Sequence, residues 1–244
     1  MSLPRRAIIT ITSAHASLMP GEDGKPAHTT GVFIGEALHP YNVFTAAGFE
    51  VDIVSEEGRW SEDWLSLQPG FLSEEERRQY DDKTSEFRKK LDLNLKPGDV
   101  DAEKYGIFFA SAGHAALIDY PTASGLKKIA SSIWERGGVV SAVCHGAAIF
   151  PGIIDSATGK SIIAGRTITG FTTEGEDVMK VTDVLRSWGK PLVDEWAEQL
   201  GAKYDRPDDV WGDFHVTDGR IVTGTNPQSA TSTAKEVVKV FEAL

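Results

Sequence analysis

Short apolar segments alternate with longer amphipathic segments along most of this 244-residue chain. The segments of strand length are residues 7–12, 49–55, 105–113, 139–143 and 166–171. Residues 36–47 and 124–138 have helical spacing, with Gly48 expected to end the first helix and Ser124 to cap the second. Strands that alternate with helices form a mainly parallel sheet covered on both faces, so we expect an α/β fold.

The C-terminal part of the chain predicts a hairpin and a closing helix. Asp218-Gly219 lies between two strand-like runs in residues 214–224, which is a strong hairpin signal. Residues 225–244 then have an apolar period near 3.6, and residues 184–200 look helical apart from a break at Gly189.

Residues 56–100 interrupt the α/β alternation with a charge-rich segment. Residues 74–93 within it read as one solvated helix carrying charges of both signs. We expect residues 1–244 to form a single domain, with 56–100 as a cap insertion on the sheet. The alternative is a lid or a partner surface.

Composition excludes several classes of partner. The formal net charge of −11 and pI near 5.0 disfavour nucleic acid and anionic membranes. No apolar run approaches the ~20 residues of a membrane span, and the N-terminal run reads as a first strand, not a signal peptide. A single cysteine cannot form an internal disulfide. We therefore expect a cytoplasmic protein, with the nucleus as a further compartment.

That single cysteine, Cys144, lies in VVSAVCHGAAIF (139–150), where an apolar strand enters a turn of small residues. This layout is typical of a nucleophile elbow at the carboxyl edge of a parallel sheet. A helix starting at His145 or Gly146 would lower the thiol pKa from its usual ~8.5. The alternative is an inert cysteine buried in a core strand.

Five ordered segments resemble the ThiJ/PfpI superfamily, and most closely its fungal branch of glutathione-independent glyoxalase III or heat-shock chaperone type. AVCHGAAIF resembles the superfamily's cysteine motif A-x-C-H-G-P. The other segments are GVFIGEALHPYNVFTAAGFEVDIVSEEG (31–58), IFFASAGHAALIDYP (107–121), ITGFTTEGE (168–176) and DGRIVTGTNPQSA (218–230). The resemblance covers essentially the whole chain. It implies a flavodoxin-like three-layer α/β sandwich with a mainly parallel central sheet, a C-terminal β-hairpin and a helical cap insertion.

The resemblance also implies a Cys-His-Glu triad of Cys144, His145 and Glu176, with Glu36 beside the sulfur. Read alone, Glu176 could be a carboxylate favoured by a helix N-terminus, and Glu36 could be a surface residue. Burial in the apolar helix start FIGEAL would raise the pKa of Glu36 and keep it protonated.

An oxyanion or substrate-binding site is expected at Gly113, His114, Ala115 and Gly146, with the backbone N–H groups of His114 and His145 as donors. The His114 side chain could instead pack or pair with Asp119. Two positions depart from the family pattern, because Ala115 replaces a glycine and Ala147 a proline.

The implied activity is the cofactor-free conversion of methylglyoxal, a 2-oxoaldehyde, and water to D-lactate through a cysteine hemithioacetal. This is a lactate-forming hydro-lyase reaction of the D-lactate dehydratase type. The expected partners are the small substrate and, from the resemblance, a second copy in a homodimer. No metal is expected, although Glu36 and His39 are spaced i, i+3 on a helix.

Three other functions compete with this reading: a stress-response chaperone or holdase, a cysteine peptidase or amidase, and a redox sensor. An apolar patch on the 56–100 insertion would support the chaperone. Its candidate residues are Trp60, Trp64, Leu65, Leu67, Phe71 and Leu72. A low-pKa thiol without a second cysteine would support sulfinate formation in a sensor.

Overall fold

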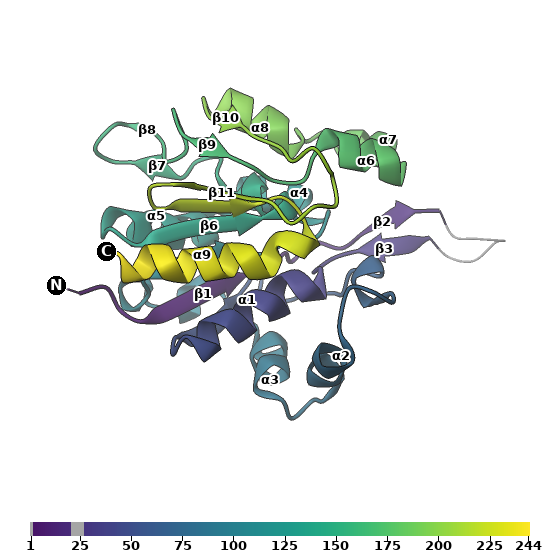
Figure 1. The fold of residues 1–244 in the computed structure, drawn as a ribbon, viewed down its shortest axis with the longest axis horizontal. Coiled ribbons are helices and arrows are strands. Elements are labelled where there is room, and N and C mark those ends of the chain that lie inside the picture. Colours follow the sequence, from purple (N-terminus) through teal and green to yellow (C-terminus); the bar gives the residue numbers. More distant parts are fainter. Residues whose placement is uncertain (1, 21–26) are drawn as a thin grey trace.

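A six-stranded sheet forms the centre of the protein in the computed structural model, which describes residues 2–20 and 27–244 (Figure 1). Across the sheet the strands are β11 (His215–Asp218), β12 (Ile221–Gly224), β6 (Val139–Val143), β5 (Ile107–Ala110), β1 (Arg6–Thr10) and β4 (Glu50–Val54). Neighbours run parallel except β11, which pairs antiparallel with β12 through the predicted hairpin. The carboxyl ends of β5 and β6 therefore lie side by side at one edge.

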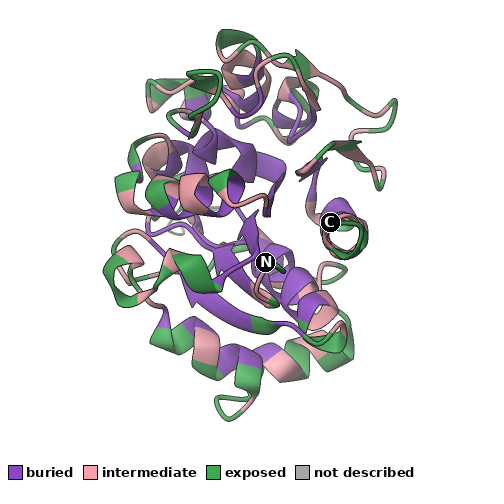
Figure 2. Ribbon diagram, turned by 90° about the vertical axis from the view of Figure 1, so that its left-hand side faces the viewer, coloured by how far each residue is buried: buried purple, intermediate pink, exposed green. Residues whose placement is uncertain are grey.

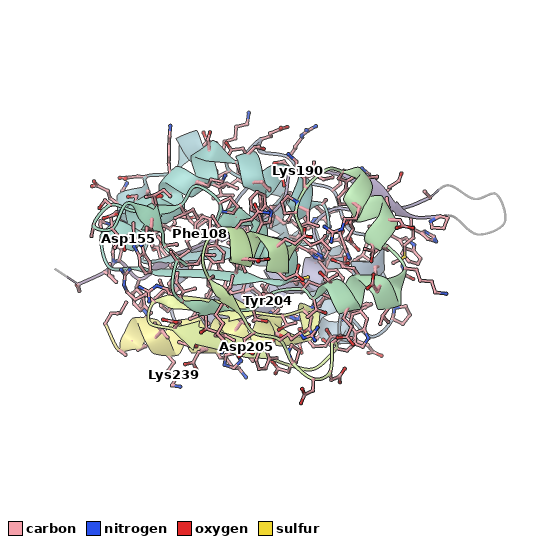
Figure 3. The ribbon with its side chains drawn as sticks, turned by 90° about the horizontal axis from the view of Figure 1, so that it is seen from above. Phe108, Asp155, Lys190, Tyr204, Asp205 and Lys239 are labelled. Carbon is pink, nitrogen blue, oxygen red and sulfur yellow. The ribbon has the colours of Figure 1, made fainter. Side chains whose placement is uncertain are left out.

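Helices cover both faces of this sheet. Helices α1 (Ile34–Ala46) and α9 (Ala230–Glu242) pack against each other on one face, and α5 (Ser124–Glu135) packs on β5 and β6 from the other. Figure 3 shows the strands between α9, marked by Lys239 at one edge, and the helices at the opposite edge. Figure 2 shows buried residues concentrated in the strands and on the inner sides of the helices. The predicted flavodoxin-like α/β sandwich is confirmed.

Smaller elements lie around the main sheet. The helices among them are α4 (Ala116–Asp119), α6 (Thr173–Met179), α7 (Thr182–Ser187) and α8 (Val193–Gln199). The short strands are β2 (Ala16–Met19) with β3 (His28–Thr30), β7 (Ile154–Asp155) with β8 (Lys160–Ser161), and β9 (Thr167–Ile168) with β10 (Lys203–Tyr204). The chain also has 3-10 turns at Leu65–Leu67, Pro97–Asp99, Ala102–Lys104, Tyr120–Thr122, Cys144–Ile149 and Pro227–Ser229.

Two local predictions need correction. Residues 166–171, expected as a strand of the main sheet, supply only the short β9, which pairs with β10 outside it. Ser124 is the first residue of α5, not its cap. The Glu56 carboxylate caps this helix from a distance, accepting the N–H groups of Gly125 and Leu126 at 2.9 Å each.

The charged segment forms two helices, not the single one predicted. Helix α2 (Glu74–Asp81) ends before Asp82, and α3 (Glu86–Leu93) starts after its own cap, Ser85. The Asp82 carboxylate accepts hydrogen bonds from the Thr84 N–H and hydroxyl, which favours a turn over a continuous helix.

Asp52 joins this segment to the sheet. It lies on edge strand β4, is 5% exposed, and accepts hydrogen bonds from Lys90 of α3 at 2.7 Å, Arg6 at 2.8 Å and the Tyr105 hydroxyl at 2.8 Å. Burial acts to raise the pKa of Asp52, but these partners outweigh it and hold the pKa below its usual value. The packing of residues 56–100 therefore depends on an ionised carboxylate.

None of the described helices is both long and apolar enough to cross a bilayer.

Replacing Asp52 should destabilise the fold in a pH-dependent way. At pH 7 we expect Asp52→Asn to lower the free energy of unfolding by about 2 kcal/mol, because Arg6 and Lys90 lose their shared counter-charge. The native pKa lies below the unfolded value of ~3.9, so this contribution is present above that value and disappears as pH falls through the native pKa.

Urea unfolding at pH 7 and pH 3 measures this effect. Asp81→Asn, which breaks an exposed pair with Arg77, is the matched control and should change stability by less than ~0.5 kcal/mol. Equal effects of the two substitutions at pH 7 would contradict the role given to Asp52.

Candidate active site

The backbone bends sharply at Cys144, where β6 ends. Its φ is 57°, in the left-handed region that costs an L-residue ~1–2 kcal/mol. Gly146 makes the following turn feasible, because a Cβ there would lie 2.2 Å from the Ala110 carbonyl oxygen of β5. The six residues from Cys144 form a 3-10 turn, where a helix was expected to start at His145 or Gly146. The elbow itself is present.

The bend brings Cys144 and His145 to one site, and α6 supplies its carboxylate. The Cys144 Sγ lies 3.2 Å from His145 Nδ1, and His145 Nε2 lies 2.6 Å from Glu176 Oε1. Glu176 belongs to the first turn of α6 and is 2% exposed. The structure thus brings together the three residues of the expected triad, and each ring nitrogen of His145 has a partner.

His114 also binds Glu176, which the sequence reading did not foresee. Its Nε2 lies 3.0 Å from Glu176 Oε2, so one carboxylate bridges two imidazoles whose centroids are 4.2 Å apart. Asp119, the suggested partner of His114, accepts instead from Thr12 and from the Ser13 N–H. His114 follows β5 and Cys144 follows the adjacent β6. The order of the strands in the sheet could therefore have predicted that His114 lies near Cys144.

The pKa values of the two histidines that bind Glu176 shift in opposite directions. Burial acts to raise the Glu176 pKa, but His145 and His114 lower it to about 2. Burial likewise opposes the charged form of His114, yet the charge of Glu176 outweighs it and raises the His114 pKa. Burial, followed by the charge of His114, lowers the pKa of His145. The site therefore favours a charged His114 and a neutral His145.

Glu36 lies in the first turn of α1 and is fully buried, as expected. One carboxylate oxygen, Oε2, accepts the Ala112 N–H at 3.1 Å, whereas Oε1 has no hydrogen-bond partner among the described residues. Burial raises the Glu36 pKa to about 8, against the opposing effects of Cys144 and the Ala112 amide. This carboxyl is therefore largely protonated at pH 7. It ionises as the pH rises through about 8.

The thiol pKa shifts in the opposite direction from the prediction. Burial first, and then the charge of the neighbouring Glu36, raise the pKa of Cys144 above its usual value. The His145 backbone amide opposes this shift without reversing it. Burial therefore favours the protonated thiol, and the neighbouring Nδ1 of His145 is placed to accept its proton.

The cluster of His114, His145 and Glu176 could be read as a metal site. Ligand atoms on a tetrahedral zinc lie roughly 3.3 Å apart, given zinc–ligand distances of about 2.0–2.1 Å. The contacts of 2.6 and 3.0 Å in this cluster are those of hydrogen bonds. Glu36 and His39 also have different partners, because His39 pairs with Glu76 at 3.2 Å.

A pocket of about 390 Å³ opens onto Cys144. Its wall is mainly apolar, and both Cys144 and His114 line it, whereas His145 does not. The other lining residues are Met19, Phe33, Leu65, Phe71, Gly113, Phe171, Met179, Trp211, Pro227 and Gln228. Substrate in this pocket would meet the sulfur and the His114 ring directly.

The residues expected to form an oxyanion site have different surroundings. The Ala115 N–H donates to Thr30 Oγ1 at 3.2 Å and is already engaged. Gly113 has φ of 140°, and a Cβ there would lie 2.1 Å from the Gly31 carbonyl oxygen. This glycine shapes the wall of the pocket, and the role of backbone amides in binding an oxyanion stays a prediction.

The six apolar residues proposed as a chaperone patch line the pocket or pack against other side chains. Leu65 and Phe71 line the pocket, and Trp64 stacks on His28 with ring centroids 3.6 Å apart. The remaining three residues of that set, Trp60, Leu67 and Leu72, pack against the core.

Comparison with known proteins extends these findings. Glyoxalase 3 of Candida albicans is 46% identical over 97% of this chain and 98% of its own length. Glutathione-independent glyoxalase HSP31 of Saccharomyces cerevisiae is 46% identical over 99% of this chain and 98% of its own length. The crystal structure of glyoxalase III from Candida albicans superposes with a TM-score of 0.92, at 45% identity and 98% coverage of both chains.

The DJ-1/PfpI family profile matches residues 31–240, a span that contains the elbow, both histidines and both buried glutamates. The chain therefore belongs to the DJ-1/PfpI family.

Proposed function

We propose that this chain converts methylglyoxal and water to D-lactate without glutathione. The observation that carries the proposal is the Cys144 sulfur at the wall of an apolar pocket, 3.2 Å from a histidine that Glu176 orients. The full-length relatives named as glyoxalases support the same reaction. The enzyme supplies the thiol that glutathione provides elsewhere.

In the first step, His145 Nδ1 takes the thiol proton as Sγ attacks the aldehyde carbon C1. The electron pair of the C=O bond moves to the oxygen, which receives that proton, and a neutral hemithioacetal forms. His145 suits this role because its Nε2–H donates to Glu176 and leaves Nδ1 unprotonated.

In the second step, a proton moves from C1 to C2. Ionised Glu36 takes the C1 proton, and its acid form returns a proton to C2 of the enediol. A pKa of about 8 suits both transfers, because a group that titrates near the working pH can act as base and acid. The product is a thioester of lactate. Water activated by His145 then cleaves the C1–S bond, releasing lactate and the thiol.

Loss of the sulfur should abolish the reaction. We expect Cys144→Ser to lower lactate formation in glutathione-free buffer by at least ~10³-fold, because a serine hydroxyl ionises far less readily. Chiral chromatography of the product measures both rate and configuration.

Ser141→Ala is the matched control for that variant. Ser141 lies three residues earlier on β6, and its buried hydroxyl has no hydrogen-bond partner among the described residues, so its removal should preserve the rate. Wild-type activity in Cys144→Ser would overturn the proposal.

Glu36 should set the pH dependence of the chemical step. Since the ionised form is the base, kcat should rise with pH through about 8, the native pKa of this group, and level off above it. We expect Glu36→Gln to keep the Ala112 hydrogen bond, lose ~10²-fold or more in kcat and lose this rise. Stopped-flow measurements from pH 6 to pH 9 test this, with exposed Glu74→Gln as control. An unchanged ascending limb in Glu36→Gln would contradict the assignment.

A further inference from the structure

Among the described residues, His114 alone has an imidazole that lines the pocket and leaves one ring nitrogen without a hydrogen bond. Its Nε2 binds Glu176, whereas its Nδ1 has no hydrogen bond to any described residue and is not among the fully buried orphaned atoms. His145, in contrast, uses both ring nitrogens and does not line the pocket. The two histidines therefore cannot have the same role toward a bound substrate.

We infer that His114 is a second catalytic residue, whose Nδ1–H donates to the substrate ketone oxygen beside the carbon bound to Cys144. This role rests on the proposed glyoxalase reaction and adds to the triad an acid that faces the substrate. Its geometric basis is the shared Glu176 carboxylate, which holds Nε2 and turns Nδ1 away from itself.

The proton balance of the isomerisation fits this role. When Glu36 removes the C1 proton, the C1–H electron pair forms the C1=C2 bond and the ketone π pair moves onto its oxygen. His114 Nδ1–H gives that oxygen a proton, which yields an enediol and a neutral imidazole. As Glu36 returns a proton to C2, the O–H on C1 gives its proton to His114 and the thioester carbonyl forms. Both residues end in their starting states.

The electrostatics of the cluster support an acid at His114. The groups that face it are the Glu176 carboxylate at 3.0 Å, the His145 ring at 4.2 Å between centroids, and the buried Asp63 carboxylate, whose charge also acts on it. Opposite pKa shifts in two neighbouring groups are the usual sign of separate acid and base roles.

His114→Gln tests the inference, because glutamine can still donate to Glu176 but cannot supply the acid. In the wild-type protein, loss of the His114 proton at alkaline pH should lower the rate, because the acid is then missing. We expect His114→Gln to form lactate ~10²-fold or more slowly and to lack this alkaline fall. Iodoacetamide alkylation of Cys144, the only cysteine in the chain, should stay within about twofold of wild type, since the hydrogen-bond partner of the sulfur is His145 and not His114. His145→Gln is the matched control and should slow both alkylation and lactate formation.

A second variant separates acid catalysis from positioning. His114→Ala leaves a gap in the pocket wall, so added imidazole should restore part of its activity, whereas His145→Ala, whose site does not line the pocket, should not respond. A His114→Gln protein with wild-type rate and alkaline limb would overturn the inference. So would parallel loss of alkylation, which would make His114 a positioning residue for the triad. Failure of the wild-type protein to form lactate would instead refute the proposed function itself.

Discussion

The left-handed bend at Cys144 is the constraint on which the site depends. Consecutive residues of a straight strand point to opposite faces, so an unbent β6 would separate the sulfur from the His145 ring. The observed φ of 57° places them 3.2 Å apart, and Gly146 lets the turn pass close to the Ala110 carbonyl. Parallel pairing of β5 with β6 holds the strand that leads into this bend, and adjacent strand ends bring His114 to the same point. The sheet thus maintains a strained geometry that a short peptide would not keep.

Burial gives the assembled groups their chemical character. Glu176 remains ionised because it accepts hydrogen bonds from two imidazoles, whereas Glu36, with an amide and a thiol as neighbours, holds its proton to about pH 8. Two carboxyls in one site therefore take different roles, one orienting histidines and the other moving protons.

The sequence predicts the architecture and the triad better than the finer geometry. Apolar runs reveal β6 and its elbow because both are local patterns, and the family resemblance supplied Glu176 and Glu36. The same patterns misplaced residues 166–171, because an apolar run does not tell which strand it will pair with. The direction of the Cys144 pKa shift and the His114–Glu176 contact depend on burial and on groups distant in the chain, which local rules cannot supply.

The central claim is that the Cys144 sulfur forms a covalent bond to substrate during turnover. Rapid-quench peptide mass spectrometry during a single turnover with methylglyoxal tests it directly. The account predicts a transient substrate adduct on the peptide that contains Cys144, rising before lactate and decaying as lactate accumulates, and missing in Cys144→Ser. Lactate formation at the wild-type rate with that peptide unmodified at every time point would contradict it.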